Sequence, residues 1–299
     1  MIKITPTSEA VKFHNEKVNE IFDKLISDGY ILRNKKQKKI CKDFINFLIK
    51  YKDELINALP NRLLEIHEEF EMKNFSKHQI VLIRSFFIQT GYGKFQNKEF
   101  LNFLGIDTCV YCNRNYTLYF GENNARAELD HWFPKSEFPI LALSFYNLIP
   151  SCHSCNHIKL NNSPIGGWKN ALNVINHPYL DKNDFKFSYY YNSFSDFNLN
   201  INVKMNSKSN ETLKFNKINE IYSAHSNKEL NDLLSLRYKY SDNYIDILVN
   251  KTFIGTPFSK EEIYRMIFGI EIHPEDYHKR PFSKFKHDII EELKQTKKY

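Results

Sequence analysis

The chain has 299 residues, is 42% hydrophobic and carries a formal charge of +7, so it can bury one large core or two to three smaller ones. The mildly basic balance is compatible with nucleic-acid binding, and equally with an ordinary lysine-rich surface. No stretch approaches the ~20 apolar residues of a membrane span, and the first residues lack a signal-peptide core, so we expect a soluble, cytoplasmic protein.

Residues 1–104 are predicted to form an all-helical N-terminal lobe of four or five helices. Apolar residues recur there at helical spacing, and glycine or proline stands where each stripe should end. One stretch breaks the pattern with six basic residues in ten positions. It forms either a strip that contacts phosphates or a solvated loop leading into a helix: Arg33, Lys35, Lys36, Lys38, Lys39 and Lys42.

The middle of the chain, residues 105–180, differs from the first region because it contains β-prone segments. Residues 116–120 are β-prone, and residues 125–132 are expected to pair back on them. Pro134 ends any strand there, because proline cannot donate to a ladder. The apolar run 140–146 fits helix and strand equally, and a short helix is expected from Cys155 to Lys159.

The last third, residues 181–299, is predicted to be a β-hairpin over 181–206 followed by helices. One of these helices begins after Ser259, which has capping-box spacing to Glu262. A final helix is expected over 283–298. The chain is therefore predicted to be α+β and mainly α, with a small core between two larger lobes.

Four of the five cysteines fall into two Cys-x-x-Cys pairs, Cys109/Cys112 and Cys152/Cys155. This is the spacing of a structural zinc site with four thiolate ligands. Unpaired Cys41 and the close pairing favour reduced thiols in a cytoplasm over a secreted disulfide scaffold. A zinc ion here would pin both ends of the segment between the pairs.

Within and just after that segment the sequence resembles the HNH, or His-Me finger (ββα-metal), endonucleases, over roughly residues 105–165. The motif residues are Asp130, His131, Asn147, Asn156 and Lys159. The resemblance implies that His131 is the general base that activates water for attack on a phosphodiester. It implies that Asp130 is a ligand of the catalytic cation, that Asn147 orients the imidazole, and that Asn156 is the second ligand.

Asn156 stands where the family often has histidine, so an amide oxygen would favour Mg²⁺ or Mn²⁺ over a transition metal. His157 is the alternative ligand, although neighbours on a helix diverge by about 100°. Adjacent strand residues point to opposite faces, so Asp130 and His131 can serve one site only at a strand end or twist. Lys159 and Lys135 are candidate nucleic-acid contacts.

A broader resemblance is to the Septu-type (PtuB-like) HNH nucleases of bacterial anti-phage systems. It rests on residues 109–115, 130–136, 143–152 and 279–284. It implies a DNA-cleaving enzyme controlled by an ATPase partner of the ABC/SMC kind, with the two lobes as docking surfaces. Two other interpretations remain open: a zinc-ribbon nucleic-acid-binding adaptor with an inert HNH-like site, and an RNA-cleaving toxin.

Overall fold

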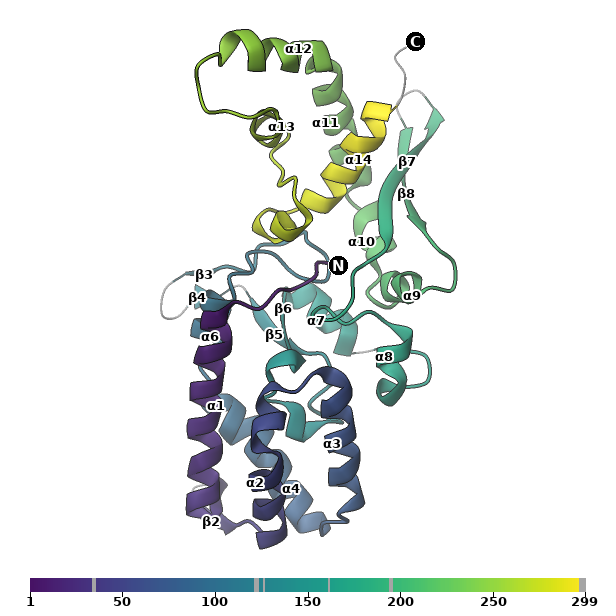
Figure 1. Ribbon diagram of the computed structural model, residues 1–299. Coiled ribbons are helices and arrows are strands. Elements are labelled where there is room, and N and C mark those ends of the chain that lie inside the picture. Colours follow the sequence, from purple (N-terminus) through teal and green to yellow (C-terminus); the bar gives the residue numbers. More distant parts are fainter. Residues whose placement is uncertain (34–35, 121–123, 126, 161, 194–195, 296–299) are drawn as a thin grey trace.

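The computed structural model describes residues 1–33, 36–120, 124–125, 127–160, 162–193 and 196–295. It is mainly helical and has three regions, with the cysteine-containing segment in the middle between an N-terminal helical lobe and a C-terminal lobe (Figure 1). Buried apolar side chains from all three regions join in one hydrophobic cluster. None of the described helices is long and apolar enough to cross a bilayer.

The N-terminal lobe contains the predicted helices. Its first helix begins where the Thr7 side chain accepts from the backbone N–H of Ala10, and it ends at Gly29 in the left-handed conformation. The helices are α1 (Ser8–Asp28), α2 (Lys42–Asn57), α3 (Pro60–Met72), α4 (Lys77–Ser85), the π-helical η1 (Phe86–Gly91), α5 (Tyr92–Lys94) and α6 (Asn97–Leu104).

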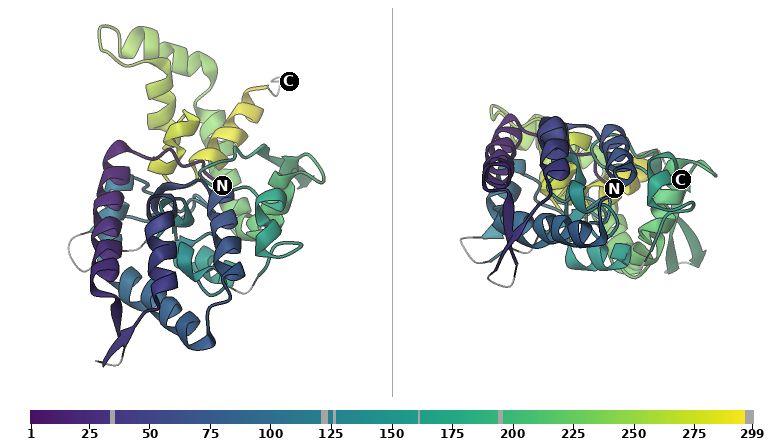
Figure 2. Two further views of the ribbon diagram at one scale, coloured as in Figure 1. Left: turned by 60° about the horizontal axis from the view of Figure 1, so that its bottom comes forward. Right: turned by 90° about the horizontal axis from the view of Figure 1, so that it is seen from below.

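The prediction that this lobe is all-helical is wrong between α1 and α2. There the chain forms an antiparallel hairpin of β1 (Tyr30–Arg33) and β2 (Lys36–Lys39). Ile31 and Ile40 are buried at its base, and these two apolar anchors leave the lysine-rich strand β2 fully exposed. The hairpin projects beyond the helices at one end of the lobe (Figure 2).

The first four residues do not belong to the N-terminal lobe. Their backbone crosses the centre of the molecule, where Ile2 N–H donates to Val110 and Ile4 N–H donates to Pro178. The lobe is tied to the same region by His14 in α1, whose Nε2 donates to the carbonyl of Leu143 at 2.9 Å. The N-terminal lobe is therefore packed on the centre rather than tethered to it.

The central region is built on a hairpin and a helix. Strand β5 (Glu128–His131) pairs antiparallel with β6 (Leu148–Ser151), and α7 (His153–Leu160) follows directly. The expected pairing of 125–132 with 116–120 is confirmed only at its start: among the described residues there, β3 (Tyr119–Phe120) pairs with β4 (Asn124–Ala125), and residues 128–131 pair with β6 instead. The apolar run becomes the 3₁₀ turns η2 (Pro139–Leu141) and η3 (Phe145–Asn147), and beyond α7 lie η4 (Trp168–Asn170) and α8 (Ala171–Val174).

The C-terminal lobe follows the prediction closely. The hairpin is present, and Ser259 and Glu262 form the predicted capping box, with both reciprocal hydrogen bonds. The elements are β7 (Phe185–Ser193), β8 (Asp196–Val203), α9 (Lys208–Phe215), α10 (Ile218–Ser223), α11 (Ser226–Lys239), α12 (Asp242–Ile247), η5 (Leu248–Thr252), α13 (Lys260–Phe268), η6 (Pro274–Lys279) and α14 (Ser283–Gln295).

Candidate functional site

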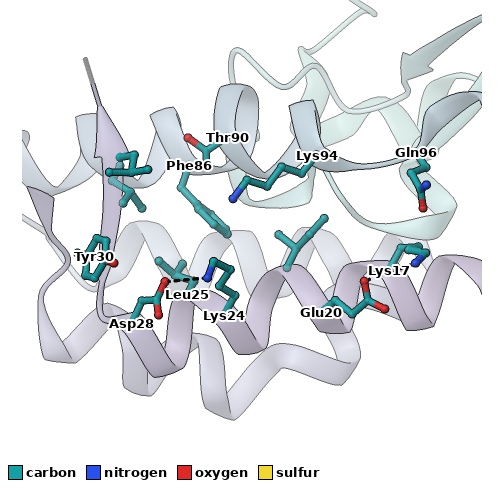
Figure 3. Close-up of a pocket in the computed structure, with 13 residues that line it drawn as sticks. Lys17, Glu20, Lys24, Leu25, Asp28, Tyr30, Phe86, Thr90, Lys94 and Gln96 are labelled. Carbon is teal, nitrogen blue, oxygen red and sulfur yellow. Dashed lines mark ion pairs between the residues drawn. The ribbon is translucent and has the colours of Figure 1, made fainter. Parts of the chain in front are cut away.

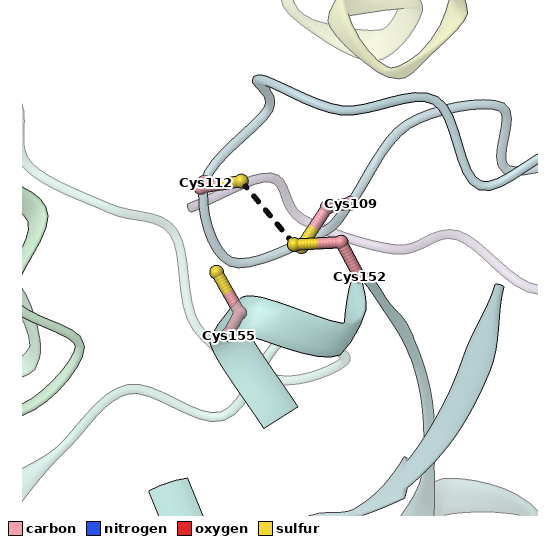
Figure 4. Close-up of side chains that lie close together, drawn as sticks. All are labelled: Cys109, Cys112, Cys152 and Cys155. Atoms are coloured by element: carbon pink, nitrogen blue, oxygen red, sulfur yellow. Dashed lines mark hydrogen bonds between the residues drawn. The ribbon is translucent and has the colours of Figure 1, made fainter. Parts of the chain in front are cut away.

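The four paired cysteines converge at the centre of the molecule (Figure 4). All four are buried, and their sulfur atoms lie within 4.8 Å of one another, with Cys112 Sγ 4.0 Å from Cys152 Sγ. Four thiolates about 2.3 Å from a tetrahedral zinc ion would be about 3.8 Å apart. The cluster therefore has the size and the ligand set of a structural zinc site.

Local backbone geometry positions the two cysteines of each Cys-x-x-Cys pair. The first pair flanks a tight turn, closed by a hydrogen bond from Asn113 N–H to the Cys109 carbonyl at 2.7 Å. The second pair spans the start of α7, where Asn156 N–H donates to Cys152. The two segments are joined by Val110 N–H, which donates to Pro150 in β6. The cysteines thus fix the turn, the second strand and the helix together.

Asp130 connects this cluster to the candidate catalytic site. Its side chain is buried, and its Oδ2 accepts hydrogen bonds from the Tyr111 hydroxyl at 2.5 Å and from Lys159 Nζ at 2.7 Å. Tyr111 lies between the first two cysteines, and burial raises its pKa well above the usual range, so it remains a donor. The cysteine turn therefore holds the carboxylate that the resemblance assigns to the cation.

Lys159, a predicted nucleic-acid contact, is buried. Only 5% of it is accessible, and besides Asp130 its ammonium donates to the backbone carbonyl of His131 and lies 5.0 Å from the Trp168 ring centroid. Lys135 is half-buried, with its ammonium 4.8 Å from the ring centroid of Tyr92. Burial lowers the pKa of both lysines, and Asp130 opposes that shift in both.

His131 is the last residue of β5. It therefore stands at a strand end, where adjacent residues such as Asp130 and His131 can serve the same site. Its buried imidazole contacts the ring of Tyr92, 4.7 Å between centroids, and its Nε2 lies 3.1 Å from the carbonyl of Ala142. A carbonyl can only accept, so Nε2 carries the proton and Nδ1 is the basic atom. Burial, with the charges of Lys135 and Lys159, lowers the pKa of His131 to about 3.

Asn147 contacts the loop around His131 rather than the imidazole itself. Its amide accepts from Phe133 N–H at 2.6 Å and donates to the carbonyls of Phe133 and Leu141. Leu141 directly precedes Ala142, whose carbonyl holds the imidazole. Asn147 therefore contacts the backbone beside the carbonyl that holds the imidazole, and the expected contact with the imidazole itself is not among the hydrogen bonds of its side chain.

Asn156 contacts β5 directly, and His157 lies on the exposed side of α7. Asn156 Nδ2 donates to Glu128 Oε2 at 2.7 Å, whereas His157 is exposed and stacks on His153 at 6.0 Å between centroids. His153 Nδ1 lies 2.7 Å from the other Glu128 oxygen. Burial raises the pKa of Glu128, but the hydrogen bonds from Asn156 and His153 outweigh it, and the net shift is downward.

The sequence analysis did not identify three features of this site: the involvement of Glu128, the involvement of Tyr111, and the burial of Lys159. Glu128 and Asp130 are two apart on one strand and so share a face, a period-2 signal that the sequence does contain. Tyr111 carries no such signal, because only the three-dimensional closure of the cysteine cluster brings it to Asp130. Both carboxylates of β5 therefore contact α7, Glu128 through Asn156 and Asp130 through Lys159.

The described basic residues of the stretch 33–42 lie on the β1–β2 hairpin and at the first position of α2, outside the hairpin–helix unit of this site. Arg33, Lys36, Lys38, Lys39 and Lys42 are exposed, and Lys35 lies outside the described residues. A groove of about 580 Å³ runs along α1 beneath the hairpin (Figure 3). Its lysines Lys17 and Lys24 pair with Glu20 and Asp28, and Lys94 also lines the groove.

Comparison with known proteins gives one partial match. No family model and no solved structure matches the chain. Over 73 residues, 23% of its length, the chain is 34% identical to the Septu protein PtuB of Bacillus thuringiensis. That stretch is 27% of the PtuB sequence, so the match covers about a quarter of the curated relative. By sequence, the chain is similar to one part of a Septu protein.

Proposed function

We propose that the protein is a metal-dependent endonuclease of the HNH type that hydrolyses DNA phosphodiester bonds. The observation that supports the proposal is that one hairpin–helix unit beside the four-cysteine cluster carries His131 and Asp130 on its first strand and Asn156 on its helix. A strand end supplies the base, its neighbour supplies a carboxylate, and the following helix supplies an amide. This is the order of parts that HNH nucleases use.

The residues have the properties that phosphodiester hydrolysis needs. His131 is neutral at physiological pH, and its Nδ1 is the atom that can take a proton from water. The Ala142 carbonyl, steadied by Asn147 through Leu141, holds the tautomer with the proton on Nε2. His131 can therefore act as general base from a fixed orientation.

The cation would be held by Asp130 and Asn156, with Glu128 at the edge of the same set. When bound, a divalent cation would offset the negative charge that builds on the phosphate. The hydrogen bond from Asn156 Nδ2 to Glu128 directs the nitrogen of that amide toward β5. The amide oxygen is the end that remains to act as a ligand.

Nuclease activity is tested by incubating the zinc-loaded protein with supercoiled plasmid DNA and either Mg²⁺, Mn²⁺ or EDTA. We expect nicked and linear products with either cation and none with EDTA, and we expect Asp130→Asn to lose the response to the cation. Salt-sensitive binding without cleavage at any cation concentration would favour the inert adaptor. Faster cleavage of a structured RNA than of DNA would favour the toxin.

The likeness to a Septu protein supports an anti-phage role beside an ATPase partner of the ABC/SMC kind. We propose that the two lobes flanking the central unit dock that partner. Inactivity of the isolated protein followed by cleavage on addition of an ATPase encoded beside it would show control by the partner. A cleavage rate that does not change with the ATPase would contradict it.

We also propose that the β1–β2 hairpin contacts the DNA backbone. Arg33 stands directly opposite Lys36, and like charges in that arrangement destabilise a hairpin unless an anion lies between them. Phe86 lines the groove beside the hairpin, and Tyr92, six residues on, contacts His131. The groove beside the hairpin and the ring that contacts His131 therefore belong to one continuous helical segment, η1 followed by α5.

Changing the four hairpin cations to glutamine should weaken DNA binding and flatten its dependence on salt. Removing one lysine or arginine from a phosphate lowers the slope of log K against log[salt] by about 0.9. The matched control changes four exposed lysines of the C-terminal lobe, which lowers the formal charge equally, from +7 to 7 − 4 = +3. Equal slopes in both variants would exclude the hairpin as a specific contact. The two sets are Arg33, Lys36, Lys38 and Lys39, and Lys182, Lys186, Lys228 and Lys251.

A further inference from the structure

Lys159 is a buried cation at the point where the proposed site would bind another cation. Its ammonium donates to Asp130 Oδ2 at 2.7 Å and to the carbonyl of His131, and it lies over the ring of Trp168. Both side chains of the ion pair are almost inaccessible, 5% for Lys159 and 6% for Asp130. A lysine is seldom buried this deeply without a charged partner that requires it.

The ion pair also occupies one of the two oxygens of the Asp130 carboxylate. Asp130 Oδ2 already accepts from the Tyr111 hydroxyl at 2.5 Å in addition to the ammonium. Removing one member of a buried ion pair leaves the other charge without compensation, at a substantial cost in free energy. Lys159 therefore stabilises the ionised Asp130 in the protein without a divalent cation.

We infer that Lys159 is a built-in counter-cation of Asp130 that competes with the divalent cation for this carboxylate. The inference rests on the proposed function, because it takes Asp130 as the ligand of that cation. Binding of the divalent cation would require the ammonium to withdraw from Oδ2. The released ammonium would remain over Trp168, close to His131, where it is placed to meet a phosphate group of the substrate.

Competition and a purely structural role predict opposite signs for one measurement. If Lys159 competes, replacing it with a neutral residue removes the repulsion and tightens cation binding. If Lys159 only holds the site together, the same change loosens the site and weakens binding. Asp130 and Lys159 come from β5 and α7, so both roles would affect cleavage, and activity alone cannot separate them.

The test is calorimetric titration of Mn²⁺ into the zinc-loaded, full-length protein and three variants. Lys159→Gln keeps an amide donor but no charge, and it should bind Mn²⁺ about tenfold or more tightly than the parent, the factor expected for removal of a charge-assisted hydrogen bond. Lys159→Arg keeps the charge and should show no gain. Asp130→Asn should lose the binding. Zinc content and thermal unfolding verify that each variant is folded.

The outcomes separate the inference from the function on which it rests. Binding that depends on Asp130 but is equal or weaker in Lys159→Gln would overturn the inference and leave the proposed function standing. Equal binding by the parent and Asp130→Asn would remove Asp130 from the cation site and overturn both. If Lys159→Gln does not fold, Lys159→Met provides the same comparison, because it also lacks the charge and fills similar volume beside Trp168.

Discussion

Replacing His131 with alanine should lower the rate of DNA cleavage by about 10²- to 10⁴-fold, the range that a general base contributes. The reason is geometric. The Ala142 carbonyl holds the proton on Nε2, which leaves Nδ1 free of a proton and able to accept one from water. The measurement is the single-turnover rate of plasmid cleavage at saturating Mg²⁺, expressed per folded, zinc-loaded protein.

The chain offers a matched control in His14. This histidine is also buried, and its Nε2 donates to the carbonyl of Leu143, the residue after Ala142. Its pKa is lowered to about 4, mainly by burial, much as that of His131 is lowered to about 3. His14→Ala should therefore lose comparable stability but retain cleavage. Equal cleavage by the His131 and His14 variants would remove His131 from the role of base.

The parts of the site that follow from local sequence were predictable. The spacing of the two Cys-x-x-Cys pairs indicated the cluster, and Pro134 indicated that His131 stands at a strand end; the structure confirms both. Helix α7 was also expected, because asparagine, proline and glycine close it on the far side. Each of these signals lies within a few positions of the feature that it predicts.

The parts that depend on distant pairing were not predictable. Strand β5 pairs with β6, which begins 20 residues further along the chain, at Leu148 compared with Glu128. Several nearby segments had similar β-propensity, so the sequence did not indicate which of them was the partner. Lys159 has the local sequence of a surface lysine because its partner, Asp130, is 29 positions away. The basic segment was expected to be a loop or helical turn, and its strand pairing is set by the burial of Ile31 and Ile40 at its base.

Replacing Cys155 with serine should remove bound zinc and lower the thermal stability of the protein by more than about 10 °C. Structural zinc contributes roughly 10–16 kcal/mol to folding of its site, which is comparable to the whole stability of a typical domain, about 5–15 kcal/mol. The cluster joins the Cys109 turn, β6 and α7, so its loss should release all three. Zinc content and thermal unfolding measure the change.

Cleavage should be lost with the zinc, although no residue of the proposed catalytic set has been altered. Tyr111, between the first two cysteines, holds Asp130, and Asn156 directly follows Cys155, so the cation ligands lose their supports when the cluster opens. Cys41→Ser is the control, because Cys41 is half-buried at the start of α2 and takes no part in the cluster. It should keep one zinc ion per chain and the parent stability. A Cys155→Ser protein that retained zinc, stability and cleavage would show that the cluster does not support this site.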